Sequence, residues 1–351
     1  MPARRRTWLF LVLLCVAIAA PVVIAARKNP ITVEISVGFS CVTGSGPKRS
    51  EVIATLKSEE GDKRDRVVTR TDKYGFWGAC FRLFSPSTYI NGGDQLKIKI
   101  GENVRKIDVP LLQPQINRVS DVISGVSFPH SQVDISVAHH RDFQHVKNYF
   151  FSATADAKGR YKVDTSSKFN LIGWDSVEIF VSRGADLYGA LAVVPGMQVS
   201  VISNDVVGYV NDGTRLRISI RDKDGGLRGA VTAGPFLFGG FEVVMFKKDG
   251  RALYPRANDT LRATFAGDAI MKIPASRLRG SPETDMVSGR CPPNAPYQLI
   301  VRGRAFNGTT DKDGNFKRYI GAKVNVRRGD DLTLYCQFPS GDVWEDLNVA
   351  L

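Results

Sequence analysis

The stretch that decides the fold is Thr69-Arg-Thr-Asp-Lys-Tyr-Gly-Phe-Trp77, because the chain repeats it. Ala153-Thr-Ala-Asp-Ala-Lys-Gly-Arg-Tyr161 is a second copy, and Thr309-Thr-Asp-Lys-Asp-Gly-Asn-Phe316 is a third. In each copy a Gly, one further residue and an aromatic residue follow an Asp. Asp bonds the backbone two residues on, Gly takes φ > 0 without steric cost, and an aromatic residue favours a strand. The pattern predicts a tight hairpin corner and a strand whose ring points into a core.

The spacing of this motif indicates a tandem repeat. A degenerate copy without the Asp, Gly239-Gly240-Phe241, fills the long gap between the second and third copies. The corner glycines at 75, 159, 239 and 314 are then separated by 84, 80 and 75 residues. Each corner is followed by an aspartate that opens an alternating apolar run: Asp94, Asp175, Asp259 and Asp331. Each is preceded by a glycine after Val or Ser: Gly38, Gly125, Gly208 and Gly289. Three markers in the same order, four times over, predict four modules.

We therefore expect an all-β chain after residue 30, with a helical turn or two only within 342–351. The predicted modules span residues 30–113, 115–199, 200–275 (the degenerate one) and 276–351. Runs such as Leu96–Ile100 alternate apolar and polar residues, which is the period-two signature of half-buried strands. Pro110 and Pro114 predict a short, stiff linker after the first module.

The first 26 residues predict export from the cytoplasm. Arg4-Arg5-Arg6 precedes the uncharged run Trp8–Ala26, which has small residues before a cleavage position after Ala25. This pattern favours a cleaved secretory signal. The alternative is an uncleaved hydrophobic anchor helix, because the run is just long enough to span a bilayer. Both interpretations place residues 27–351 outside the cytoplasm, as a secreted or anchored chain, and limit membrane contact to residues 8–26.

Four of the five cysteines lie in the predicted modules and support an oxidising compartment. Cys41 and Cys80 fall in the first module, and Cys291 and Cys336 fall in the fourth. Of the three possible pairings, we expect Cys41–Cys80 and Cys291–Cys336, because the others would tie the first module to the last. Loops of this size contribute about 4 kcal/mol each in the chain-entropy model. Buried free thiols are the alternative.

The charge of the chain favours anionic partners. Its formal net charge is +13, and signal cleavage would remove Arg4, Arg5 and Arg6 and leave +10. Such a balance favours contact with cell-wall polymers, acidic glycans or lipid headgroups. The Lys and Arg residues are scattered along the sequence, and no stripe interleaves them with aromatic residues. Specific nucleic-acid binding is therefore not expected, and a solvated basic exterior is the simpler interpretation.

All four histidines lie in the second module, and three of them form the one candidate metal cluster. His139, His140 and His145, with Asp142, offer imidazole and carboxylate ligands. Their spacing matches no zinc pattern, and adjacent residues on a strand face opposite ways. We therefore interpret them as a polar loop between strands and expect no cofactor. The chain also has no Gly-x-Ser-x-Gly elbow, phosphate loop, His-Glu-x-x-His or Cys-x-x-Cys motif, which argues against an enzyme.

The segment from Ile123-Ser-Gly125 to Val133-Asp-Ile-Ser-Val137, followed by the corner at Ala153–Tyr161, resembles bacterial Ig-like modules. It is also similar to carboxypeptidase regulatory-like and Cna protein B-type modules, which share the Thr-Asp-x-x-Gly-x-Phe corner. The second module carries the resemblance best and the third only weakly. The resemblance implies tandem β-sandwiches that act as spacers, adhesion units or accessory binding modules, and it specifies the fold more than the function.

Two functional hypotheses follow from the sequence. The first is a non-enzymatic, extracytoplasmic, multi-module binding or spacer protein of the cell envelope or secreted fraction, whose partner is a protein or an anionic glycan or cell-wall polymer. The second is an enzyme or metal-dependent protein whose site is assembled around the histidines of the second module. The absence of catalytic motifs favours the first hypothesis.

Overall fold

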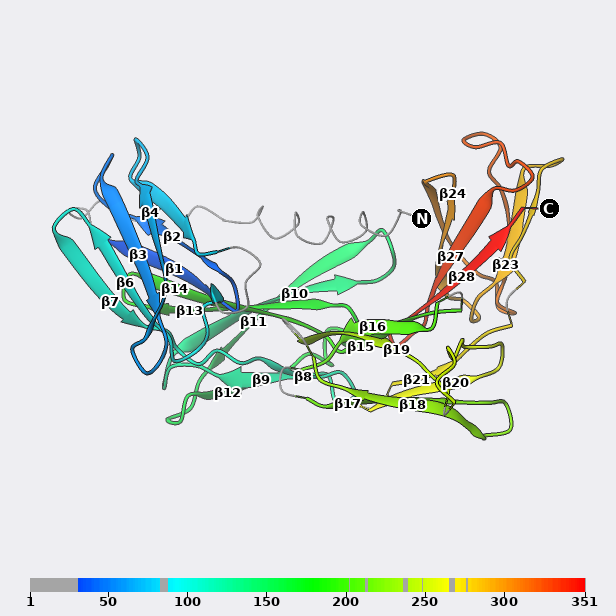
Figure 1. The fold of residues 1–351 in the computed structure, drawn as a ribbon, viewed down its shortest axis with the longest axis horizontal. Coiled ribbons are helices and arrows are strands. Elements are labelled where there is room, and N and C mark those ends of the chain that lie inside the picture. Colours follow the sequence, from blue (N-terminus) through cyan, green and yellow to red (C-terminus); the bar gives the residue numbers. More distant parts are fainter. Residues whose placement is uncertain are drawn as a thin grey trace. The chain divides into compact units, whose positions relative to one another are not determined.

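The computed structural model describes residues 31–82, 88–201, 203–211, 214–235, 239–247, 249–264, 269–275 and 277–350. These residues belong to one compact unit and form 28 strands, with no α-helix among them. The described chain is thus all-β, as predicted (Figure 1). The predicted signal or anchor helix at residues 1–26 lies outside the described residues. Within the described ranges, no helix has the length and apolar character needed to cross a membrane.

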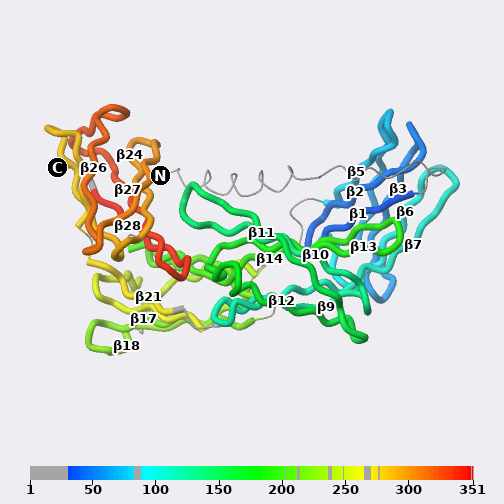
Figure 2. Tube along the Cα trace, turned by 180° about the vertical axis from the view of Figure 1, so that it is seen from behind, coloured from blue at the N-terminus to red at the C-terminus, as the bar shows by residue number. Residues whose placement is uncertain are grey.

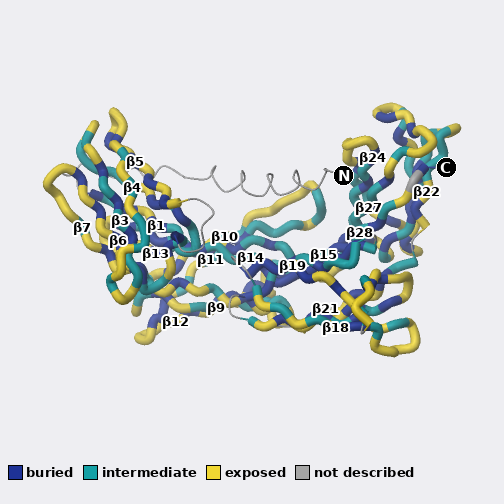
Figure 3. The backbone as a smooth tube through the Cα atoms, viewed as in Figure 1, coloured by how far each residue is buried: buried dark blue, intermediate teal, exposed yellow. Residues whose placement is uncertain are grey.

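The first module is a sandwich of two sheets. One sheet contains β1 (Thr32–Val37), β2 (Cys41–Ser45) and β5 (Phe76–Cys80). The other has the order β4 (Lys63–Arg70), β3 (Glu51–Lys57), β6 (Gln95–Ile100) and β7 (Asn103–Asp108). Buried residues alternate with intermediate or exposed ones along β3, β5 and β6, as the sequence pattern predicts, and Figure 3 shows this alternation.

The second module repeats this architecture. Its three-stranded sheet has the order β12 (Arg160–Asp164), β9 (Val122–Val126) and β8 (Gln115–Asn117). Its other strands have the order β11 (Val146–Thr154), β10 (Gln132–His140), β13 (Ser176–Arg183) and β14 (Asp186–Val193). These four strands are part of a larger sheet, because β14 pairs in parallel with β1 of the first module, with Ile35 opposite Tyr188.

The two modules therefore share one seven-stranded sheet, β11-β10-β13-β14-β1-β2-β5, which can be followed from behind in Figure 2. Ile35 and Tyr188 are both buried on the same face of this sheet. The four-stranded sheet of the first module and the three-stranded sheet of the second cover that face as a second layer. We call this arrangement the first pair.

The third and fourth modules form a second pair with the same design. The seven-stranded sheet has the order β19 (Gly240–Val244), β16 (Asp205–Tyr209), β15 (Gly196–Ser200), β28 (Val343–Val349), β27 (Asp331–Gln337), β24 (Pro296–Val301) and β25 (Arg304–Thr309). Its parallel join is between β15 and β28. The four-stranded sheet has the order β18 (Leu227–Ala233), β17 (Leu216–Arg221), β20 (Thr260–Thr264) and β21 (Ala269–Lys272). The three-stranded sheet has the order β22 (Arg279–Ser281), β23 (Met286–Arg290) and β26 (Asn315–Tyr319).

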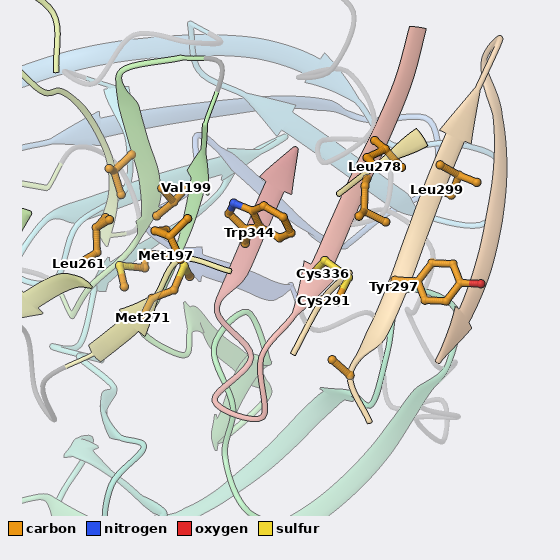
Figure 4. Packing of buried hydrophobic residues seen from close by; sticks show 14 of the residues in the cluster. Met197, Val199, Leu261, Met271, Leu278, Cys291, Tyr297, Leu299, Cys336 and Trp344 are labelled. Atoms are coloured by element: carbon orange, nitrogen blue, oxygen red, sulfur yellow. A yellow bond between two sulfur atoms is a disulfide. The ribbon is translucent and has the colours of Figure 1, made fainter. Parts of the chain in front are cut away.

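Each pair has its own hydrophobic core. One core cluster runs from Ile31 to Val194 and the other from Met197 to Ala350. In the second pair the parallel join is itself part of the core: Trp344 of β28 lies opposite Val199 of β15 and is fully buried (Figure 4). Strand pairing across a module boundary thus continues the core from one module into the next.

The hairpin corner has the predicted geometry. Asp72 Oδ1 accepts hydrogen bonds from the backbone N–H groups of Tyr74 and Phe76, at 2.8 and 2.9 Å. Asp156 and Asp311 make the same two bonds. All four corner glycines have positive φ, between 76° and 95°. The degenerate third copy keeps the glycine without the aspartate.

The aromatic residue of each corner is buried against a glycine of the neighbouring strand. The cross-strand pairs are Gly44 with Trp77, Gly125 with Tyr161, Gly208 with Phe241 and Gly289 with Phe316. A Cβ at any of these glycines would lie within 3 Å of the ring, so the missing side chain makes the space that the ring fills.

The structure corrects four details of the sequence prediction. The glycine marker of the first module is Gly44, not Gly38. The aspartate marker of the fourth module is Asp330, not Asp331, as its hydrogen bonds below show. Strand β15 (Gly196–Ser200) crosses the predicted boundary at residue 199 and pairs with β16, so it belongs to the third module. The predicted helical turns within 342–351 are strand β28, because hydrogen bonds to β27 and β15 select the extended backbone.

Candidate functional sites

The predicted metal candidates of the second module separate into two unconnected groups. His139 Nδ1 lies 2.9 Å from Asp175 Oδ2, and the backbone N–H of His140 donates to Asp175 Oδ1 at 2.8 Å. His145 Nδ1 lies 2.8 Å from Asp142 Oδ2 in the exposed turn beyond β10. Within the described ranges, no group of three or more His, Cys, Asp or Glu side chains is placed to hold a metal ion. The imidazoles of His139 and His145 therefore contact two different aspartates.

Asp175 is one of four equivalent aspartates, each of which closes the turn before the sixth strand of a module. In every module the carboxylate accepts the N–H of the residue three positions earlier, and the carbonyl accepts an N–H from the end of the module's last strand. The four residues are Asp94, Asp175, Asp259 and Asp330. The repeated aspartate is thus a structural element that fixes a turn, which explains why it recurs along the sequence.

The basic partner of this aspartate differs between modules. Arg64 pairs with Asp94, Arg228 pairs with Asp259, and Arg302 lies 3.9 Å from Asp330. In the second module His139 takes the place of the arginine. The neighbouring His140 is half-buried, and this burial lowers the pKa of its imidazole. The contact between His139 and Asp175 therefore takes the position that an arginine–aspartate ion pair occupies in the other modules.

A second repeated aspartate fastens the two modules of each pair. Asp186, at the start of β14, accepts the N–H of Val33 at 3.0 Å. Asp342, just before β28, accepts the N–H of Met197 at 2.9 Å. In both pairs the aspartate of one module caps the first strand of the other, next to the parallel strand join. These residues were not identified from the sequence, because their role depends on which strands pair.

These two aspartates are neutralised by arginines from different parts of the chain. Arg105 of β7, in the same pair, makes a two-pronged contact with Asp186 and also donates to the carbonyl of Ile31. Arg118 makes the equivalent contact with Asp342, at 3.2 and 3.0 Å. Arg118 follows β8 in the second module, so this ion pair links the first pair to the second. Its side chains are 6% and 1% exposed, which makes it a buried connection.

Further contacts surround Arg118 and complete a junction between the pairs. The amide of Asn211 in the third module donates to the carbonyl of Ile116 in β8 and accepts its N–H, at 2.9 and 3.0 Å. This side chain occupies the edge of β8 as a further strand would. Trp174 packs edge-on against Tyr209. We call this set of residues, together with Gly173 and Ser340, the junction.

The loop around Gly173 brings the backbones of the two pairs into direct contact. The N–H of Gly173 donates to the carbonyl of Ser340 at 2.7 Å. A Cβ at Gly341 would lie 2.4 Å from the nitrogen of Gly173, so only glycine permits this approach at residue 341, where φ is +84°. The same loop ends at Asp175, so the histidine–aspartate group of the second module also holds a junction segment in place.

Two disulfides are present, in the pairing expected from the sequence. Cys41–Cys80 joins directly opposed residues of β2 and β5 within one sheet, and Cys80 is exposed. Cys291–Cys336 joins the end of β23 to β27 across the sandwich, and both cysteines are buried (Figure 4). The two bridges thus connect different strand pairs.

Comparison with known proteins gives similarity to solved structures only. No protein-family model matches the chain, and no curated protein matches it. Among solved structures it is similar to the tetra-tandem repeat in the extending region of a large adhesion protein, at 16% identity. That similarity covers 92% of this chain and 100% of the other, with a TM-score of 0.17.

Two further solved structures are also similar to the chain. The BSP domain of a biofilm-associated protein is 6% identical, over 94% of this chain and 99% of that one, with a TM-score of 0.20. A Ca²⁺-stabilized adhesin by which an Antarctic bacterium binds ice is 10% identical, over 93% and 99%, with a TM-score of 0.16. At these TM-scores the functional argument rests on the molecule's own geometry.

Proposed function

We propose that residues 27–351 form a non-catalytic, extracytoplasmic arm that serves as a stiff spacer or binding unit at the cell envelope or in the secreted fraction. The observation that carries this proposal is the way the modules are connected. Within a pair they share a sheet through β1–β14 and β15–β28, and between pairs they share the buried ion pair Arg118–Asp342. None of these connections is a free linker, and shared sheets and buried contacts oppose hinge motion.

Two features support the proposed location. The two disulfides are typical of proteins that fold in oxidising compartments. The basic and apolar start of the chain is typical of an export signal or an anchor, and membrane contact would then involve only residues 8–26. An unidentified protein, or an anionic glycan or cell-wall polymer, is the partner that a mature chain of charge +10 favours.

A distance measurement between spin labels tests the stiffness directly. Cysteines replace two exposed lysines on either side of the junction, Lys158 of the second module and Lys223 of the third, in the purified full-length protein. We expect one narrow distance distribution, and a broader one when Arg118→Ala is added. A broad distribution in the protein without Arg118→Ala would contradict the proposal. A label pair within one module, at Lys158 and Lys147, controls for the mobility of the labels themselves.

Elemental analysis separates this proposal from the metal-dependent alternative. We expect protein purified without an affinity tag to contain no stoichiometric zinc or copper. A stoichiometric metal that is lost in His139→Ala or His145→Ala would favour the alternative, in which the histidines of the second module form a functional site.

A further inference from the structure

The strand register sorts the charged residues by sheet, although they are scattered in the sequence. On the outer faces of both seven-stranded sheets, the described outward-facing positions include no Lys or Arg. The charged residues there are acidic: Glu34, Asp134 and Glu178 in the first pair, and Asp205, Glu242, Asp331 and Glu345 in the second. Each pair therefore has one layer in which the charged residues at the described outward strand positions are all acidic.

The opposite layer carries the positive charge. On the four-stranded sheet of the first module, Arg66, Thr55, Lys97 and Lys106 lie side by side across four strands. Lys99 is two residues along β6 on the same face. We call Arg66, Lys97, Lys99 and Lys106 the first basic face. All four are exposed, and among the described residues none of them has an ion-pair partner. Two acidic residues share this sheet face, but they pair with other residues across the strands: Glu51 lies opposite Arg70, and Asp108 lies opposite Gln95.

The third module has the same arrangement on the equivalent sheet. Arg217 and Arg221 of β17 face outward, and Arg262 lies opposite Ser219 on β20. Lys272 of β21 lies opposite Thr260. We call Arg217, Arg221, Arg262 and Lys272 the second basic face. No acidic residue shares its described outward positions, which otherwise carry Ser, Thr, Ala, Ile and Leu.

The three-stranded sheets belong to the same layer, and most charged residues at their outward positions are also basic. In the second module these are Arg160 and Lys162, beside Asp164. In the fourth module they are Arg279, Arg290 and Lys317. The segregation therefore holds in both pairs: the seven-stranded layer is acidic outside, and the layer packed against it is basic outside.

We propose that the two basic faces form a divided binding site for a linear acidic polysaccharide of the cell surface. This rests on the proposed function and names the surface and the ligand class for it. The faces repeat at equivalent sheets of two modules, so a polymer with regularly spaced carboxylate or sulfate groups can contact both, and each contact raises the effective concentration at the other. The acidic outer faces of the seven-stranded sheets repel the same polymer, which restricts binding to one layer.

The chemistry of the faces favours a polysaccharide over single-stranded nucleic acid. None of the described outward positions on the two four-stranded sheets is aromatic, so bases of single-stranded nucleic acid have nothing to stack on. Each face also has a short hydroxyl side chain beside its cations, which can hydrogen-bond sugar hydroxyls. Thr55 in the first face and Ser219 in the second occupy such positions.

The test compares variants of equal net charge on polygalacturonate beads. One variant carries Lys97→Gln, Lys99→Gln and Lys106→Gln, and a second carries Arg217→Gln, Arg262→Gln and Lys272→Gln. The matched control removes three exposed lysines of the hairpin corners, Lys73→Gln, Lys158→Gln and Lys312→Gln. At about 0.05 M salt we expect each face variant to bind about tenfold or more weakly than the control, and all binding to disappear by about 0.5 M.

Every outcome decides the proposal. Equal weakening of face and control variants would overturn it in favour of net charge alone. Tighter binding to single-stranded DNA, or to vesicles of phosphatidylglycerol, than to polygalacturonate would overturn the ligand class. Light scattering that shows self-association of the free protein, lost in the face variants, would mean that the basic faces bind the acidic faces of a second copy. Absence of binding in all proteins, with narrow spin-label distances, would reject this inference and leave the spacer function standing.

Discussion

Arg118 and Asp342 are separated by 224 residues, yet their side chains form a two-pronged ion pair that is almost completely buried. Asp342 also caps Met197 at the parallel join of the second pair. Its counterpart in the first pair, Asp186, has the same role but is neutralised by Arg105 of its own pair. One repeated carboxylate thus closes the first pair on itself and ties the second pair to the first.

Arg118→Ala should therefore lower the free energy of unfolding more than Arg105→Ala does. Arg118→Ala leaves the buried carboxylate of Asp342 without its partner, so we expect a loss of about 3–5 kcal/mol in the free energy of unfolding. Arg105 is a third exposed, so Arg105→Ala should cost about 1–2 kcal/mol. Denaturant unfolding measures both, and a double-mutant cycle with Asp342→Ala isolates the interaction. A loss below about 1 kcal/mol for Arg118→Ala would contradict the role of the junction.

Gly44→Ala should destabilise the first module by about 1–3 kcal/mol, because its Cβ would lie 2.1 Å from the carbonyl oxygen of Thr32 and 2.8 Å from the ring of Trp77. Gly78→Ala is the matched control on the adjacent strand. Its Cβ would meet only Thr43, at an ordinary 3.8 Å, so we expect a change within about 0.5 kcal/mol. Chemical denaturation with Trp fluorescence reports both, and equal effects would reject the glycine–aromatic pairing as the reason for the repeat.

Glu345→Gln should make the protein more stable at about pH 7. Burial raises the pKa of this carboxyl, while hydrogen bonds from Tyr335, Gln198 and Ser200 oppose the shift. Because the folded-state pKa lies above the unfolded one, the folded state binds a proton more readily, and the penalty for the charged form is relieved as pH falls through the folded pKa. The stability difference between the variant and the wild type should therefore shrink toward about pH 4. A stability difference between the two proteins that grows on acidification would show that folding does not raise the pKa of Glu345.

The two disulfides should differ in their response to reductant. Cys80 is exposed on β5, whereas Cys291 and Cys336 are 2% and 0% exposed in the core. We expect a mild reductant on the native protein to open Cys41–Cys80 first, because exchange requires access to a sulfur atom. Alkylation followed by peptide mapping gives the order. Simultaneous opening of both bridges would mean that reduction follows global unfolding. Loss of either bridge should cost about 4 kcal/mol in the chain-entropy model.

The parts of the fold that could be predicted from the sequence are those that depend on neighbouring residues. The corner at Asp72, Gly75 and Trp77 is a local turn, so its residue types predict it directly. The same pattern also indicates the degenerate third module. Alternation along β6 likewise reports one buried face. The two markers that were wrong, Gly38 and Asp331, lie close to residues with the true contacts, Gly44 and Asp330, and only the strand register distinguishes them.

The pairing of modules could not be predicted in the same way. The join of β1 with β14 connects strands about 150 residues apart, and no local pattern reports which edges meet. Arg118, Asn211 and Asp342 gain their roles only from that arrangement. The charge pattern has the same origin: Arg66 and Lys97 are far apart in the sequence, yet each lies opposite Thr55 on the same sheet. A scattered distribution along the chain is thus compatible with segregation by sheet.

Hydrogen exchange at β1 tests most directly the claim that the modules are joined by shared sheets. In four independent modules, β1 (Thr32–Val37) would be an edge strand, and the amides that do not bond to β2 would exchange as fast as the outer amides of β4, which has a neighbour on one side only. In the paired arrangement β14 covers that edge. We predict that every amide of Ile35, Ser36 and their neighbours within β1 is protected to the level of the central strand β3. Fast exchange at alternate amides of β1, at the rate seen in β4, would contradict the account.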